Sequence, residues 1–151
     1  MKNLGLVLIF TILFSSKCFS QDNLHGLSAK VAYSTLEKYS FGVGYNFVKF
    51  KDDWGWSRLA HNYYLEYVPE HKALGLSANI QYTLIFAKAG MEASFRSKNE
   101  MNNSYFSFYP YLGFDLLNGD LSFGPELLTY KSDSKDVGFK IVFKIHPKLI
   151  K

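Results

Sequence analysis

Four histidines are the residues of this chain best suited to acid–base or metal chemistry: His25, His61, His71 and His146. An imidazole can transfer a proton or bind a metal, but both roles need an orienting acid or further ligands close by. No set of His, Asp and Glu has metal-ligand spacing, and no glycine motif has the spacing of a phosphate-binding loop. The sequence therefore predicts no catalytic residue, no metal ligand and no cofactor.

The first 20 residues are typical of a secretory signal peptide. Lys2 precedes an apolar run from Leu4 to Phe14, and small residues lead to a plausible cleavage point after Ser20. A membrane anchor is the alternative, but the run is only about half of the roughly 20 residues that a spanning helix needs. We therefore expect residues 1–20 to be removed during export, leaving residues 21–151 as the mature domain.

The only cysteine, Cys18, lies inside this leader. A lipoprotein signal would make it the first mature residue, but that processing requires a leucine three residues earlier and a small residue just before. Ser15 and Lys17 stand at those positions. Cleavage after Ser20 leaves a mature chain without cysteine, which excludes a disulfide framework and a thiol nucleophile.

Composition limits the classes of function. The full chain has 17 basic and 13 acidic residues, and loss of Lys2 and Lys17 with the leader leaves 15 against 13. This small excess predicts no nucleic-acid partner. Aromatic residues make up 18% of the chain, with 11 Tyr and 14 Phe, and such residues favour β-strands and membrane interfaces.

Alternation of apolar and polar residues is the dominant pattern of the mature chain. Eight segments show this period of two, and most have about ten residues, which is enough for a tilted strand to cross a bilayer. In the seventh the alternation blurs around Pro125, which is consistent with a β-bulge. The segments cover residues 27–33, 39–47, 59–67, 74–82, 87–96, 105–115, 121–126 and 137–146.

Polar connectors separate these segments. Asn118-Gly119-Asp120 is the clearest hairpin signal. Residues 35–38, 69–72, 97–104 and 131–136 are also polar. The stretch from Lys49 to Arg58 stays open, because Trp54 and Trp56 lie in its middle and the flanking strands could extend into it.

Alternation alone does not decide which face points inward. A soluble barrel places the apolar face inside, whereas a membrane barrel places it outside. Small residues and nearly balanced charges on the polar face favour a narrow, ion-paired lumen. Tyrosines near the ends of the apolar face also resemble the aromatic girdles of membrane barrels: Tyr33, Tyr39, Tyr45, Tyr63, Tyr67 and Tyr82. The expected lumen charges are Lys30, Glu66, Lys88, Glu92, Arg96, Asp115, Glu126, Lys140 and Lys144.

This pattern resembles the small eight-stranded outer-membrane β-barrels of Gram-negative bacteria. Such proteins tend to end in a polar-x-Gly-x-x-aromatic-x-aromatic signal for the barrel assembly machinery, and Asp136, Gly138, Ile141 and Phe143 occupy those places. Ile141 is aliphatic, and the chain continues to Lys151. The leader is also similar to those of Bacteroidetes. The resemblance implies an all-β, eight-stranded antiparallel up-and-down transmembrane barrel, with outer-membrane lipid and the assembly machinery as partners.

Three functions follow as hypotheses. The first is a non-enzymatic outer-membrane barrel with a structural role or a surface interaction made by residues 97–104 and 131–136. The second is a soluble periplasmic or secreted barrel that binds an apolar small molecule, as lipocalins do. The third is a lipid A-modifying enzyme, as some barrels of the resembled group are. No histidine has the His-x-Ser-Asn context of the deacylases, and His61 on the apolar face is the remaining candidate.

Overall fold

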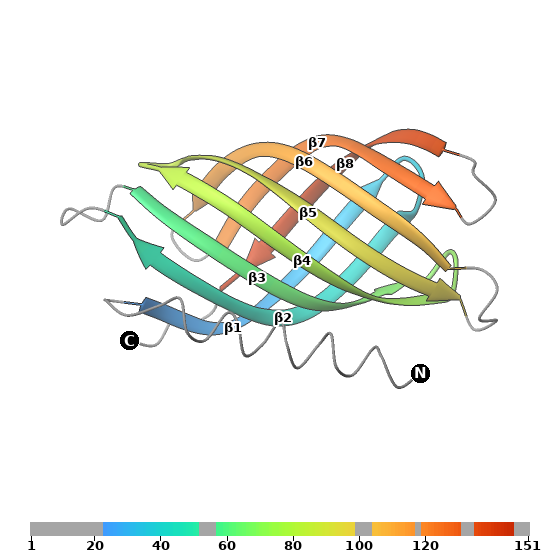
Figure 1. Cartoon of the computed structure of the whole chain (residues 1–151), viewed down its shortest axis with the longest axis horizontal. Coiled ribbons are helices and arrows are strands. Elements are labelled where there is room, and N and C mark those ends of the chain that lie inside the picture. Colours follow the sequence, from blue (N-terminus) through green and yellow to red (C-terminus); the bar gives the residue numbers. More distant parts are fainter. Residues whose placement is uncertain (1–22, 52–56, 99–103, 117–118, 131–134, 147–151) are drawn as a thin grey trace.

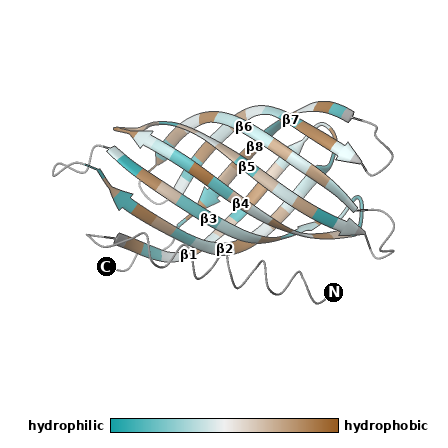
Figure 2. Cartoon of the chain, in the orientation of Figure 1, coloured by the Kyte–Doolittle hydropathy of each residue, from teal (hydrophilic) through white to brown (hydrophobic). Residues whose placement is uncertain are grey.

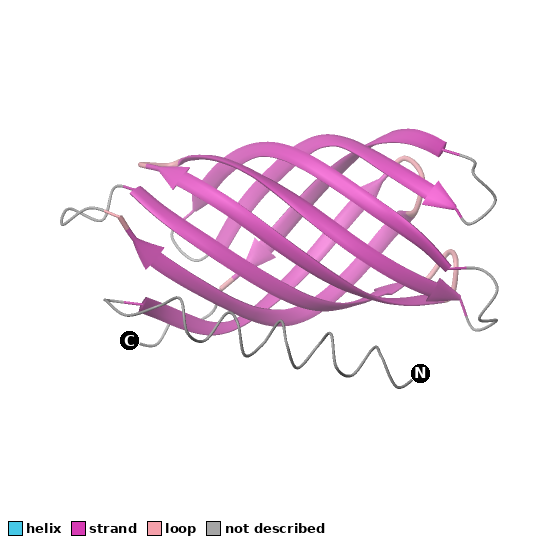
Figure 3. Ribbon diagram, in the orientation of Figure 1, coloured by secondary structure: helices cyan, strands magenta, loops and turns pink. Residues whose placement is uncertain are grey.

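Eight β-strands form the protein in a computed structural model, which describes residues 23–51, 57–98, 104–116, 119–130 and 135–146 (Figures 1 and 3). The predicted signal peptide lies outside the described residues. No helix in the described part of the chain is long and apolar enough to cross a membrane. The strands are β1 (Asn23–Ser34), β2 (Lys38–Phe50), β3 (Ser57–Val68), β4 (Ala73–Leu84), β5 (Ala87–Lys98), β6 (Ser104–Leu116), β7 (Gly119–Tyr130) and β8 (Lys135–Ile145).

The strands close into a barrel in sequence order. Each pairs antiparallel with the next, and β8 returns to β1 over Ala29–Ser34 and Lys140–Ile145. This confirms the predicted eight-stranded antiparallel up-and-down barrel. We call the end where β1 begins and β8 finishes the terminal end, and the opposite end the turn end. In Figure 1 the terminal end is on the left.

Strands two and three are longer than the alternation predicted. Phe50 pairs with Arg58, so both edges of the stretch left open by the sequence belong to the sheet. Trp54 and Trp56 lie outside the described residues. Similarly, Gly119 and Asp120 belong to β7 rather than to a turn, since they pair with Leu116 and Asp115.

The β4–β5 connection carries no usual turn signal. It consists of Ile85 and Phe86, both more than half exposed, and Ile85 has a φ of 59°. A β-branched residue rarely adopts positive φ, and such tight hairpins normally use glycine or asparagine. The turn is held from outside the hairpin, because the Asp115 amide donates to the Phe86 carbonyl at 2.7 Å.

The predicted bulge at Pro125 is wrong. Leu112 pairs with Phe123 and Phe108 with Leu127, so the β6–β7 register is the same on both sides of the prolines. Pairing lapses only between them, where Pro125 meets Pro110. Proline has no amide hydrogen to donate to a ladder, so two opposed prolines interrupt the bonding without shifting the strands.

Hydrophilic and hydrophobic residues alternate along the strands, as the teal and brown bands in Figure 2 show, and the two faces of the sheet therefore differ sharply. Outward strand positions hold 27 of the 29 large apolar or aromatic side chains that are at least 37% exposed, including Leu27, Val43 and Leu112, and the other two are Ile85 and Phe86 of the β4–β5 turn. Inward positions are mainly polar, charged or small, and most are under 9% exposed. The barrel is therefore inverted relative to a soluble protein, in which apolar residues normally fill the inside.

Candidate functional site

Arg96 is the centre of an ion-pair network in the turn-end half of the interior. Its Nε and Nη2 donate to Glu66 Oε2 at 3.2 and 2.6 Å, and its Nη1 donates to Glu37. Lys30 bridges Glu66 and Glu92, with 2.9 Å to Glu92 Oε1. All of these side chains are at most 1% exposed. Buried charges need such partners, because an unpaired ion in a low-dielectric interior is strongly destabilising.

The network continues across the barrel to β7 and β8. Lys140 Nζ donates to Glu126 Oε1 at 2.9 Å and lies 3.6 Å from Glu92. Ser107 donates to the same Glu126 carboxylate at 2.8 Å, and Ser34 donates to its other oxygen. We call this set the turn-end cluster: Lys30, Glu37, Glu66, Glu92, Arg96, Glu126 and Lys140.

Glu37 reaches the cluster because the β1–β2 turn folds into the barrel mouth. Ser34 Oγ accepts hydrogen bonds from the amides of Leu36 and Glu37 at 3.1 and 3.4 Å. Leu36 packs against an apolar cap over this end of the interior, formed by Val68, Ala73, Tyr105 and Leu128. The turn therefore closes the mouth, with an apolar residue on the cap and a carboxylate directed at Arg96.

A second group of charges occupies the terminal-end half. Asp120 forms an ion pair with Lys88 and accepts a hydrogen bond from His146, with 3.1 Å to His146 Nε2. Arg58 pairs with Asp115 at the mouth, where their side chains are 28% and 13% exposed. We call this set the terminal-end cluster: Arg58, Lys88, Asp115, Asp120, Lys144 and His146.

Three inward tyrosines fill the space between the lysines. Lys30 lies 4.8 Å from the Tyr64 ring centroid and Lys140 lies 5.3 Å from that of Tyr109. Tyr111 stands between Lys88 and Lys144, at 5.5 and 5.1 Å. A cation near an aromatic face is attracted by the ring quadrupole, and more strongly where water is excluded. These rings therefore stabilise the lysines in addition to occupying volume.

The structure places all nine sequence-selected charges at inward positions. Eight of them are at most 4% exposed, and Asp115 lies at the mouth. It adds Glu37, Arg58 and Asp120, which the sequence reasoning assigned to connectors or turns. With these three, the interior of the described barrel holds six basic and six acidic side chains, apart from His146. Alternation could have identified Asp120 and Arg58 had the strands been extended; only the turn geometry identifies Glu37.

The histidines are not gathered into one site. His25 hydrogen-bonds to Tyr45 through Nδ1 on the exterior. His61 lies on the outward face of β3, opposite Phe47 and Ile80. The ring of His71 makes an edge-to-face contact with Tyr105 at the turn end, whereas His146 hydrogen-bonds to Asp120 at the terminal end. No group of three potential metal ligands occurs among the described residues.

Two of the four residues that resemble an insertion signal lie on the outer wall of β8. Ile141 and Phe143 point outward and are 42% and 41% exposed, and Asp136 is exposed at the turn end. Gly138 lies beside the inward turn, where an added Cβ would meet Leu36 and Thr35. The outward pair presents a continuous apolar surface, and the glycine leaves room for the β1–β2 turn.

The sequence matches no protein-family model, and no curated protein is similar to it at a significant level. Its function must therefore be argued from the distribution of charge and apolar surface over the barrel.

Proposed function

We propose that the mature chain is a non-enzymatic integral outer-membrane barrel whose exterior faces lipid. The inversion of its two faces carries this proposal. Apolar side chains cover the outside, and a charge-balanced polar network fills the inside. Lipid solvates such an exterior, whereas in water a monomer rarely exposes apolar patches beyond a few hundred Å². Closure of the sheet also satisfies the backbone without a free edge across the hydrocarbon.

The role that fits best is structural support of the envelope, with weak surface contacts. At the turn end no connector between strands exceeds five residues, the longest lying between Lys98 and Ser104. A stable protein interface uses about 20–30 residues on each side, so these connectors offer little area for a dedicated partner. An interior crossed by ion pairs is also unlike the open channel of a large porin.

A matched pair of substitutions on the exterior tests the membrane location. Val43 lies near the middle of β2 and is 64% exposed, and Val137 lies near the turn-end edge of β8 and is 69% exposed. An arginine at mid-bilayer costs about 2–4 kcal/mol but only about 0–1 kcal/mol near the interface. We expect Val43→Arg to reduce assembly in the membrane fraction and Val137→Arg to be tolerated.

The readout is gel mobility of detergent-extracted membranes, with and without boiling. Membrane barrels stay folded in cold detergent and shift only after boiling, so the wild type and Val137→Arg should both shift. Recovery of the wild type in the soluble fraction, with both arginine variants equally well folded, would contradict the proposal. It would support the soluble, ligand-binding alternative, which requires the apolar face to line the interior.

A lipid A-modifying activity would depend on His61, the candidate from the sequence. Its position on the outer wall of β3 suits an amphipathic residue near the membrane interface. We expect His61→Ala to leave the lipid A of intact cells unchanged by mass spectrometry. A changed acylation pattern would support the enzyme instead.

A further inference from the structure

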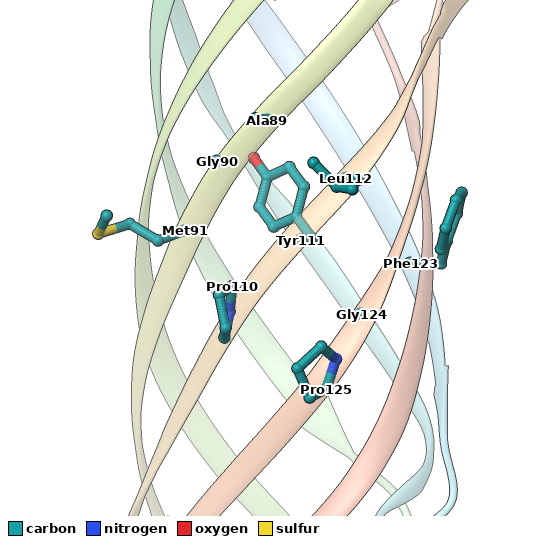
Figure 4. A pocket seen from close by; sticks show the side chains of 9 residues that line it. All are labelled: Ala89, Gly90, Met91, Pro110, Tyr111, Leu112, Phe123, Gly124 and Pro125. Atoms are coloured by element: carbon teal, nitrogen blue, oxygen red, sulfur yellow. The ribbon is translucent and has the colours of Figure 1, made fainter.

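An apolar groove of about 610 Å³ runs over the outer wall between β5, β6 and β7 (Figure 4). Pro110 and Pro125 face each other on the two strands where the pairing lapses. The side chains of Met91, Leu112 and Phe123 form the rims of the groove. On the β5 side, Ala89 and Gly90 are too small to form a high wall. The groove follows from the sequence. Two prolines interrupt the hydrogen-bonded ladder between β6 and β7, and the small residues on β5 leave the space beside it empty.

The height of the groove on the barrel limits what can reach it. Pro110 is the central residue of β6 (Ser104–Leu116), and Pro125 is close to the middle of β7 (Gly119–Tyr130). If the barrel spans a bilayer, as proposed above, this position is near the mid-plane. Lipid headgroups and water-soluble partners stay at the interfaces, so only hydrocarbon or another membrane protein can reach the groove.

Tyr111 separates the groove from the polar interior. Its ring lies between Lys88 and Lys144, and its hydroxyl donates to Gln81 Oε1 at 3.1 Å and accepts from Asn79 Nδ2 at 2.7 Å. A Cβ on Gly90 would lie 2.6 Å from this hydroxyl, so glycine lets the ring pass. The groove is therefore closed toward the lumen, and its occupant would have no charged group to pair.

We propose that this groove binds an acyl chain of a bilayer lipid and retains it as part of the folded barrel. The proposal rests on the membrane location argued above. A flexible methylene chain can follow a narrow apolar groove, and the floor of this groove is the stretch where the pairing of β6 with β7 lapses. The methylene groups of the acyl chain would then make the van der Waals contacts that no side chain makes beside the prolines and glycines. A second copy of this chain is the competing occupant, but nine residues line the groove, far fewer than the roughly 20–30 residues on each side of a stable interface.

Two substitutions fill the groove from opposite walls. Ala89→Phe places a ring over it from β5, and Pro125→Leu fills it from β7 while restoring an amide hydrogen to the seam. Ala78→Phe is the matched control, because Ala78 is also an exposed outward alanine but lies on β4, away from the groove. Pro125→Leu keeps the test decisive if the phenylalanine variant assembles poorly.

Native mass spectrometry of barrels reconstituted in phosphatidylethanolamine–phosphatidylglycerol vesicles and released in mild detergent gives the readout. We expect a retained phospholipid on the wild type and Ala78→Phe, and its loss from Ala89→Phe and Pro125→Leu. Equal retention by all four proteins would overturn the proposal, as would a dimer that disappears when the groove is filled. All samples must first show the heat-dependent gel shift. A wild type without it would contradict the membrane location, whereas a shift with unchanged retention would contradict only the lipid site.

Discussion

Replacing Arg96 by methionine removes the cation at the centre of the turn-end cluster while keeping an unbranched, uncharged stem in place of the arginine's aliphatic part. Glu66 would still have Lys30, but Glu37 would lose the guanidinium that pairs with it at the inward turn. Glu37 is 1% exposed, so its carboxylate would be left buried without a cation.

The expected cost follows from that uncompensated charge. Removal of one partner from a buried ion pair typically costs about 3–5 kcal/mol, and the whole free energy of unfolding of a protein is about 5–15 kcal/mol. Glu37→Gln should cost less, because Arg96 keeps both of its bonds to Glu66. The double variant Arg96→Met/Glu37→Gln should therefore recover part of the stability lost by Arg96→Met, which is non-additivity of neighbouring sites.

Urea titration of barrels refolded in lipid vesicles, followed by the heat-dependent gel shift, measures these differences. Lys51→Met is the control, since Lys51 is an exposed lysine beside the terminal-end mouth, and it should stay within about 0.5 kcal/mol of the wild type. A cost below about 1 kcal/mol for Arg96→Met would refute the reasoning, because surface ion pairs contribute no more than that. Such a result would mean that water enters the interior and screens its ion pairs.

Two further comparisons test the interior. Asp120→Asn should cost about 3–5 kcal/mol by leaving buried Lys88 without its anion, whereas Asp115→Asn, at the solvent-reached mouth, should cost less than about 1 kcal/mol. Similar values in urea titrations would show that the interior around Lys88 is as hydrated as the mouth. Gly138→Ala should lose about 1–3 kcal/mol, because its Cβ would meet Leu36 and Thr35. Gly42→Ala should be neutral or slightly stabilising, since the added Cβ would have its nearest neighbours at 3.4 Å, an ordinary contact distance. An equal loss of stability in Gly138→Ala and Gly42→Ala would contradict the tight packing of the β1–β2 turn against Gly138.

The exposed turn between β4 and β5 marks one limit of reasoning from sequence. Ile85 and Phe86 look like the continuation of a strand, because both residue types favour the extended state. The chain nevertheless reverses there with Ile85 at positive φ. The Asp115 amide that bonds to this turn comes from β6, a contact between residues distant in sequence, so local propensity could not reveal it.

Charge placement marks another limit. Lys30, Glu66 and Arg96 could be assigned to one face because side chains alternate strictly along a strand. Glu37 could not be assigned in this way, because it lies in the β1–β2 turn and not on a strand. It reaches the interior only because the turn bends inward, where Ser34 accepts a hydrogen bond from its amide and Leu36 packs on the apolar cap. The opposed prolines illustrate the same point: Pro125 disturbs the pattern in the sequence, but only the register shows that it faces Pro110.

The sequence by itself determined the number of strands, their approximate limits and the membership of their two faces. These are local properties, set by an alternation of period two and by the residues that interrupt it. Only the tertiary structure decided that the sheet closes, that the polar face lies inside, and which charge pairs with which. Those features depend on strand register and closure, which bring residues such as Lys30 and Glu92 from distant strands to 2.9 Å across one interior.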